Sequence, residues 1–126
     1  MTNDFVTIGG KKCYVEKDTL DLSSKGISNI KEIEGLEKLI SIRKLALSYN
    51  QIEEIKGLEQ LTGIQKLSLS GNPIKTIEGL ESFSNLQELS IRNTQLEEIS
   101  GLTPFTNLQY LDLSGNKIKA ISNLET

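Results

Sequence analysis

The sequence predicts an α/β solenoid of about five turns, whose short strands form one parallel sheet. Three features recur at a step of 22 residues and support this prediction: an apolar pair with strand-like spacing, a glycine, and a polar residue shortly after the pair. The glycines are Gly35, Gly57, Gly79 and Gly101. The apolar pairs are Leu45 with Leu47, Leu67 with Leu69, Leu89 with Ile91, and Leu111 with Leu113.

Each apolar pair marks a strand with one buried face. Leu45 and Leu47 alternate with small or polar residues, which is the period-two pattern of a half-buried strand. In the segment that follows, every third residue is apolar, at Ile52, Ile55, Leu58 and Leu61. This spacing predicts a tight helical or 3-10 return segment with one inward edge. Stacked turns then cover one another's apolar residues.

Asparagines follow the strands, where the backbone must bend inward and its polar groups become buried. Asn50, Asn72 and Asn116 occupy this place, and Thr94 fills it in the remaining turn. A buried amide can donate to one turn and accept from the next, so a stacked ladder is predicted. We therefore interpret these residues as scaffold rather than as a binding site.

The N-terminal residues predict a cap. Two strand-like runs flank Gly9 and Gly10, which is a strong signal for a two-residue hairpin turn. We expect a β-hairpin cap over residues 1–19 and a solenoid over residues 20–126, within one domain. The apolar residues that could share one face and cover the open end of the coil are Val6, Ile8, Cys13 and Val15.

The first turn is longer than the others. The pair Leu20 and Leu22 precedes the next pair by 25 residues, and the return segment gains one apolar residue. This predicts an additional helical turn on the convex side. Lys25 stands where an asparagine is expected, so the ladder should begin one turn later.

At the other end, Ile118, Ile121 and Leu124 begin a return segment, but the chain stops at Thr126. An uncovered apolar edge is therefore expected, and such an edge usually marks an interface. Three explanations stay open: stacking on a partner, stacking on a second copy as a homodimer, or a chain that is a fragment of a longer protein. The residues expected at this edge are Leu111, Leu113, Ile118 and Ile121.

The segments IRKLALSYNQI and LQYLDLSGNKI fit the pattern LxxLxLxxNxI and resemble leucine-rich repeats. Their 22-residue step is similar to the short-repeat class that includes the leucine-rich regulatory subunit of protein phosphatase 1, the axonemal dynein light chain and the spliceosomal U2 A-prime protein. The resemblance covers roughly residues 17–126. It implies a right-handed, curved solenoid whose concave strand face binds proteins.

Composition argues against catalysis. The chain has no histidine and a single cysteine, Cys13, which excludes histidine-based catalysis, histidine metal sites and an internal disulfide. Asp21 and Asp112 face the concave side roughly 19 Å apart, by the usual strand spacing, and this is too far to act together. We expect no enzyme activity, no catalytic residue, no metal and no cofactor.

Charge and hydropathy bear on location and partners. The net charge of -3 argues against a nucleic-acid partner, and no apolar run is long enough to span a membrane. The unpaired Cys13 fits a reducing, cytoplasmic location.

Strand residues that point away from the core form the concave face, and most are small, which leaves a shallow floor. Lys44 and Lys66 form a basic half beside the acidic Glu88, which suggests a partner with the opposite charge order. We interpret the chain as a non-catalytic module that binds another protein here. The alternative is a structural or assembly protein that self-associates through its uncapped C-terminal repeat. The candidate contact residues include types enriched in binding hot spots and are Lys44, Tyr49, Lys66, Glu88, Arg92, Tyr110 and Asp112.

Overall fold

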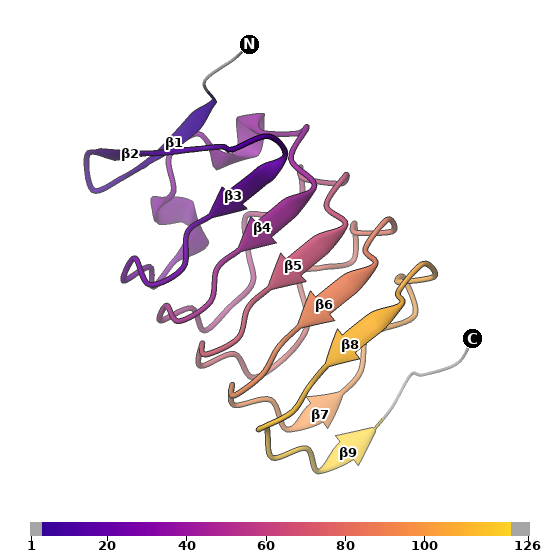
Figure 1. Cartoon of the computed structure of the whole chain (residues 1–126). Helices are drawn as coiled ribbons and strands as arrows, with labels where there is room; N and C mark the ends of the chain where they lie inside the picture. Colours follow the sequence, from indigo (N-terminus) through magenta and orange to yellow (C-terminus); the bar gives the residue numbers. More distant parts are fainter. Residues whose placement is uncertain (1–3, 122–126) are drawn as a thin grey trace.

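The computed structural model, which describes residues 4–121, is a coil of stacked turns with a parallel sheet along one side (Figure 1). The sheet has five strands in the order β3-β4-β5-β6-β8. Each strand belongs to one turn, which confirms the predicted leucine-rich-repeat type of solenoid. The strands are β3 (Thr19–Asp21), β4 (Lys44–Ala46), β5 (Lys66–Ser68), β6 (Glu88–Ser90) and β8 (Tyr110–Asp112).

Equivalent apolar residues stack because the strands pair in register. Leu45 pairs with Leu67, and Leu67 pairs with Leu89. Their side chains join the apolar residues of the return segments in one continuous core. Phe83 is the largest fully buried side chain and fills the place that Leu61 holds one turn earlier. No turn could bury these residues alone, so the stability of each turn depends on its neighbours.

The return segments run along the convex side with 3-10 geometry. The first contains two 3-10 helices, η1 (Ile30–Glu32) and η2 (Leu36–Lys38), and so carries the additional helical turn expected there. Later segments keep single 3-10 turns, as where the amide of Leu61 donates to the carbonyl of Leu58 at 3.0 Å. Because each such bond closes a tight turn, one apolar edge of the segment faces the core.

A second parallel pair lies on the convex side of the last two turns. It consists of β7 (Glu98–Ile99) and β9 (Ala120–Ile121). The amide of Lys119 donates to the carbonyl of Glu97 at 2.6 Å just before this pair. The sequence did not predict these strands, because the apolar spacing here is the same as in the earlier return segments. The expected return residue Leu124 lies outside the described residues.

The repeated glycine is explained by the backbone it occupies. Gly57 and Gly79 have φ angles of 106° and 108°, in the left-handed region that residues with a side chain rarely adopt. Their amides donate to the carboxylates of Glu59 and Glu81, each at 3.0 Å. A Cβ at Gly79 would also collide with the carbonyl of Ile55 in the preceding turn.

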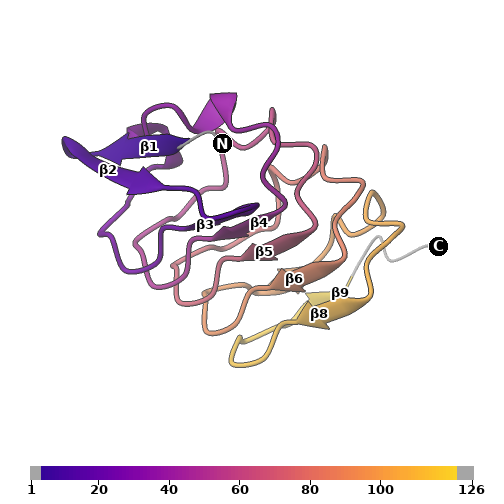
Figure 2. The ribbon, with the colours of Figure 1, turned by 45° about the horizontal axis from the view of Figure 1, so that its top comes forward.

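The expected hairpin caps the N-terminal end of the coil (Figure 2). It consists of β1 (Phe5–Ile8) and β2 (Lys11–Tyr14), which pair antiparallel. The turn residues Gly9 and Gly10 have φ angles of 56° and 83°, as a type I′ turn requires. Val6 is fully buried against the first turn, so the hairpin shields the apolar end of the solenoid.

Asn50 shows how the ladder joins the turns. Its Nδ2 donates to the carbonyls of Leu47 and Leu22, each at 3.0 Å, and its Oδ1 accepts from the amide of Ile27 at 3.0 Å. Asn72 repeats the arrangement one turn later. The cross-turn bonds therefore all reach the preceding turn, whereas the sequence predicted donation to one turn and acceptance from the next. The difference arises because both polar atoms of the amide face the same neighbour.

Thr94 interrupts the ladder. Its hydroxyl donates to Oδ1 of Asn116 at 2.6 Å and accepts from the amide of Leu96 at 3.3 Å. Within residues 4–121, its side chain makes no hydrogen bond to the preceding turn. The contact between the turns of β5 and β6 therefore lacks the side-chain bonds that an asparagine supplies elsewhere.

Candidate functional site

The concave face is the outward side of the five-stranded sheet, and short side chains occupy its centre. Ala46, Ser68 and Ser90 lie side by side on adjacent strands. The hydroxyls of Ser48 and Ser68 share a hydrogen bond of 2.6 Å, and those of Ser70 and Ser90 share one of 3.0 Å. These bonds hold short side chains close to the sheet, so another protein could approach the strands closely.

Two ion pairs occupy four of the expected contact residues. Lys66 Nζ lies 2.6 Å from Glu88 Oε2 on the adjacent strand, and Arg92 Nε lies 3.5 Å from Asp112 Oδ2. Each of these charges is therefore compensated within the chain. The expected contrast between a basic and an acidic half is reduced, and Lys44 is the contact lysine left without an ion pair among the described residues.

Asp112 anchors a polar cluster at the C-terminal end of the concave face. Its Oδ1 accepts from the hydroxyl of Ser114 at 2.7 Å and from the Ser114 amide at 3.0 Å, and the Tyr110 hydroxyl donates to its Oδ2 at 3.4 Å. The hydrogen bonds from Ser114 lower the pKa of the Asp112 carboxyl, and Arg92 adds a smaller effect. Asp112 therefore stays ionised at neutral pH. Its carboxylate oxygens already interact with Ser114, Tyr110 and Arg92.

Tyr49 is an exposed aromatic residue at the rim of the concave face. Its side chain is 66% exposed, and its backbone has a φ of 57°, which is an outlier for a bulky residue. The equivalent residues Gly71 and Gly115 adopt φ angles of 73° and 74° without that strain. Ser24 and Asn93 hold the same position and also have positive φ angles, of 57° and 52°, so this conformation belongs to the turn that follows each strand. Tyr49 differs from them in carrying a large, exposed aromatic side chain at this position.

A hollow at the N-terminal end of the concave face was missed by the sequence reasoning. Its volume is about 550 Å³, and Tyr14, Glu16, Lys17, Thr19 and Asp21 line it. In the sequence, Asp21 was weighed only as a catalytic partner of Asp112, which lies at the other end of the sheet. The signal that could have found the hollow is the short link from the predicted hairpin to the first strand, which brings Tyr14 and Glu16 beside Asp21.

The residues expected at the C-terminal edge lie together at that end of the solenoid. Leu111 and Leu113 are only partly buried, whereas Leu89 in the preceding turn is fully buried. Ile118 is also partly buried, and Ile121 is 63% exposed. The last described turn therefore presents an apolar edge.

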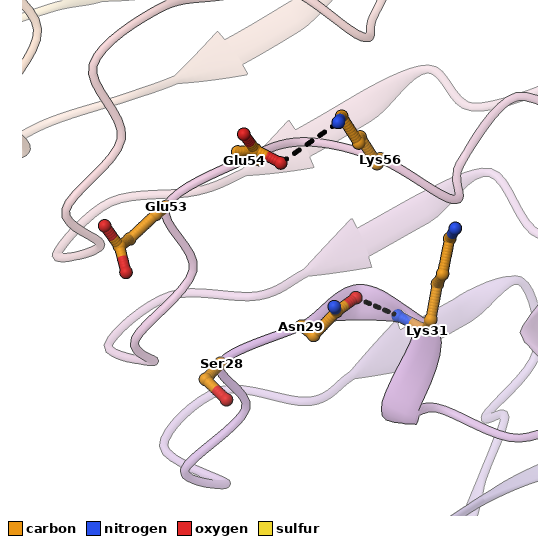
Figure 3. Close-up of a pocket in the computed structure, with 6 residues that line it drawn as sticks. All are labelled: Ser28, Asn29, Lys31, Glu53, Glu54 and Lys56. Atoms are coloured by element: carbon orange, nitrogen blue, oxygen red, sulfur yellow. Dashed lines mark hydrogen bonds and ion pairs between the residues drawn. The ribbon is translucent and has the colours of Figure 1, made fainter.

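A smaller hollow of about 380 Å³ lies between the first two return segments (Figure 3). Lys56 Nζ pairs with Glu54 Oε2 at 3.1 Å, and Asn29 Oδ1 accepts from the amide of Lys31 at 2.9 Å. These contacts are a surface ion pair and a helix cap, so we assign the hollow a structural role. It is lined by Ser28, Asn29, Lys31, Glu53, Glu54 and Lys56.

Reactive groups are sparse in the described part of the chain. Between residues 4 and 121, no three His, Cys, Asp or Glu side chains lie close enough together to hold a metal ion. No helix over the same residues is long and apolar enough to cross a membrane. The thiol-bearing Cys13 is partly shielded in β2, where it packs against the core.

The repeat geometry agrees with a known family. The family model for leucine-rich repeats (two copies) matches residues 40–82 and again residues 84–126, which together are more than half of the chain. The chain belongs to the leucine-rich-repeat family. Leucine-rich-repeat domains generally mediate protein–protein interaction and are typically not catalytic. A comparison with curated proteins finds no match.

Solved leucine-rich-repeat structures resemble this protein over most of its length. An internalin, InlF from Listeria monocytogenes, has a TM-score of 0.70 at 19% identity and shares the fold over 83% of this chain and 34% of its own. The functional domain of InlJ from the same organism has a TM-score of 0.62 at 30% identity, over 75% and 20%. A chain of the Drosophila melanogaster SNF/U2A′ complex has a TM-score of 0.64 at 29% identity, over 79% and 59%. This leucine-rich-repeat protein therefore spans less than two thirds of each of these chains.

Proposed function

We propose that this leucine-rich-repeat protein is a non-catalytic module that binds another protein on its concave face. The observation that carries the proposal is Tyr49, an aromatic residue that is 66% exposed at the rim of a floor of short side chains. Aromatic residues in such positions are typical binding anchors. Tyr110, which is also exposed, offers a second anchor on the last strand.

The internal ion pairs do not remove their members from the proposed contact surface. The side chains of Lys66 and Glu88 are 47% and 40% exposed, and exposed pairs typically contribute only about 0–1 kcal/mol to stability. A partner with a suitable charge can therefore replace either interaction at little cost. The Arg92 side chain is likewise 53% exposed. Lys44, which makes no ion pair among the described residues, can pair directly with an acidic group of the partner.

Similarity to other proteins supports a protein partner. The SNF/U2A′ structure places a similar chain within a protein complex. The proposal extends to a cytoplasmic protein that needs no cofactor or metal and has neither a nucleic-acid nor a membrane partner. We also propose that the chain belongs to the short-repeat class that contains the protein phosphatase 1 regulatory subunit. Within the chain, we propose a cap over residues 1–19 and a solenoid over residues 20–126.

Affinity capture with matched variants tests the proposal. Proteins retained by the wild-type chain should be lost when Tyr49→Ala and Arg92→Ala are combined, because the two substitutions remove both contact side chains from the concave face. They should be retained by the convex-side control Lys56→Ala, which breaks one exposed ion pair. Circular dichroism would verify that each variant is folded. The proposal would be contradicted if the double variant still retained the captured proteins while Lys56→Ala lost them.

The apolar C-terminal edge favours a second candidate function, self-association as a homodimer. Its four residues Leu111, Leu113, Ile118 and Ile121 are less buried than the core residues of earlier turns. If a second copy covers this edge, light scattering should report a dimer for the wild-type chain and a monomer for Leu113→Glu or Ile121→Glu. A dimer that survives both substitutions would contradict this alternative.

A further inference from the structure

We propose that the hollow at the N-terminal end of the concave face binds an arginine side chain of the docked protein. This inference rests on the proposed function and specifies the chemistry of one contact. The hollow lies where the hairpin meets β3, and Figure 2 shows β2 leading directly into that strand. Its lining residues include the aromatic Tyr14 and the acidic Glu16 and Asp21.

The backbone holds the walls of the hollow in place. Glu16 and Thr19 exchange two backbone hydrogen bonds, of 2.9 and 3.0 Å, across a two-residue turn. The carbonyl of Asp18 in that turn accepts from the amides of Arg43 and Lys44 at 2.9 and 3.1 Å, which attaches the turn to the segment that enters β4. A site whose frame is fixed before binding loses less conformational entropy on binding.

The carboxylates in the hollow have capacity for a cation. Oδ1 of Asp21 accepts from the amide of Ser23 at 3.0 Å, and neither Asp21 nor Glu16 takes part in an ion pair among the described residues. Asp112 holds the same register position on the last strand but is engaged by Arg92. The same residue type is therefore compensated at one end of the sheet and uncompensated at the other.

The aromatic wall favours a guanidinium. Tyr14 is 54% exposed, and its ring lies 5.6 Å from that of Phe5, centroid to centroid. Lys12 Nζ already lies 4.6 Å from the centroid of Phe5, so this aromatic pair attracts a cation within the chain. A guanidinium can stack on the Tyr14 ring and also donate two hydrogen bonds to one carboxylate, whereas an ammonium is a point charge without that planar fork.

Lys17 is the one cationic residue that lines the hollow. Its positive charge opposes an incoming guanidinium, although it pairs with no carboxylate among the described residues. The proposal therefore makes a directional prediction about this residue. Removing its charge by Lys17→Gln should strengthen arginine binding, whereas removing a carboxylate should weaken it.

The test is a ¹H–¹⁵N NMR titration of the full chain with N-acetyl-arginine amide, a probe that carries only the proposed side chain. We expect saturable shifts of the backbone amides of Tyr14, Glu16 and Asp21, and smaller effects from N-acetyl-lysine amide. The uncharged analogue N-acetyl-citrulline amide should produce no saturable shift. Asp21→Asn should weaken the binding of the arginine probe about tenfold, as expected for one lost charge-assisted pair.

The matched control is Glu37→Gln, which removes one exposed carboxylate from η2 on the convex side and should leave the titration unchanged. Equal shifts with the arginine and citrulline probes, equal affinity for lysine, or unaltered binding in Asp21→Asn would overturn the inference. Such a failure is distinguishable from failure of the proposed function, because affinity capture with the Tyr49 and Arg92 variants does not involve the hollow.

Discussion

The ring of Tyr49 lies over Gly71 of the following turn. A Cβ built on Gly71 would lie 2.6 Å from Cδ1 of Tyr49, so the ring occupies the space that any larger residue would need. Both residues have a positive φ, 57° for Tyr49 and 73° for Gly71. The strained aromatic residue and the glycine beneath it therefore form one unit at the rim of the concave face.

This relationship predicts opposite effects for two substitutions. Tyr49→Gly should raise the free energy of unfolding by about 1 kcal/mol, because glycine adopts the left-handed backbone without the penalty of a side chain. Gly71→Ala should lower it by about 1–2 kcal/mol, because alanine meets both that penalty and the Tyr49 ring. Urea denaturation would measure both changes. A Tyr49→Gly variant that is less stable than the wild type would show that the ring is retained for folding rather than for contact.

The ladder predicts a large cost for Asn72→Ala. Asn72 is 1% exposed, and its side chain bonds to the backbone of two turns. Removing its amide leaves buried polar groups without hydrogen-bond partners, which should lower the free energy of unfolding by roughly 1–3 kcal/mol. The exposed Asn85 is the matched control, and Asn85→Ala should change stability little. Equal denaturation midpoints for Asn72→Ala and the wild type would refute the ladder.

Completing the ladder should stabilise the chain. In Thr94→Asn, the new amide could donate to the carbonyls of Leu69 and Ile91, as Asn72 does to the equivalent carbonyls one turn earlier. We expect a rise of about 0.5–1.5 kcal/mol in the free energy of unfolding, the usual net value of one hydrogen bond. Thr94→Val, which removes the hydroxyl that donates to Asn116, should be destabilising in the same assay. Lower stability in Thr94→Asn would mean that the threonine geometry is required.

Glu32 gives the stability of the first return segment a pH dependence. Hydrogen bonds from the backbone amides of Asn29 and Ser28 lower its pKa below the ordinary 4.5. A lowered folded-state pKa means that the stabilisation is present above the unfolded pKa and is lost as pH falls through the folded value. Thermal melts of wild type and Glu32→Gln should therefore differ at pH values above 4.5 and converge in more acidic buffer. A constant difference between the two melts at every pH would contradict this assignment.

The repeat itself was predictable because the residues that must be buried in each turn recur at a fixed spacing in the sequence. Leu67 must alternate with exposed neighbours to lie on a half-buried strand, and Gly9 with Gly10 permits only a tight turn. The ladder position was also predictable, since a buried bend requires polar side chains such as Asn72. In each case the local backbone requirement and the stacking of the turns favour the same residue type.

Features that depend on side-chain conformation were not predictable from spacing. Lys66 and Glu88 were expected to present separate charges, yet their flexible side chains meet across adjacent strands. The left-handed backbone of Tyr49 was also not predicted, although Gly71, Asn93 and Gly115 hold the equivalent position in later turns and adopt the same conformation. The hollow beside Asp21 depends on where the hairpin turns toward the sheet, which no repeat pattern specifies.

Site-specific photo-crosslinking tests the central claim, that a protein partner docks on the concave face. A photoreactive amino acid would replace Tyr49 in one variant and the exposed convex-side residue Lys119 in another, with partners captured from the native cell. Docking on the concave face predicts a crosslinked partner from position 49 and none from position 119. The same partner crosslinked at position 119 but absent at position 49 would place the interface on the other side and contradict the claim.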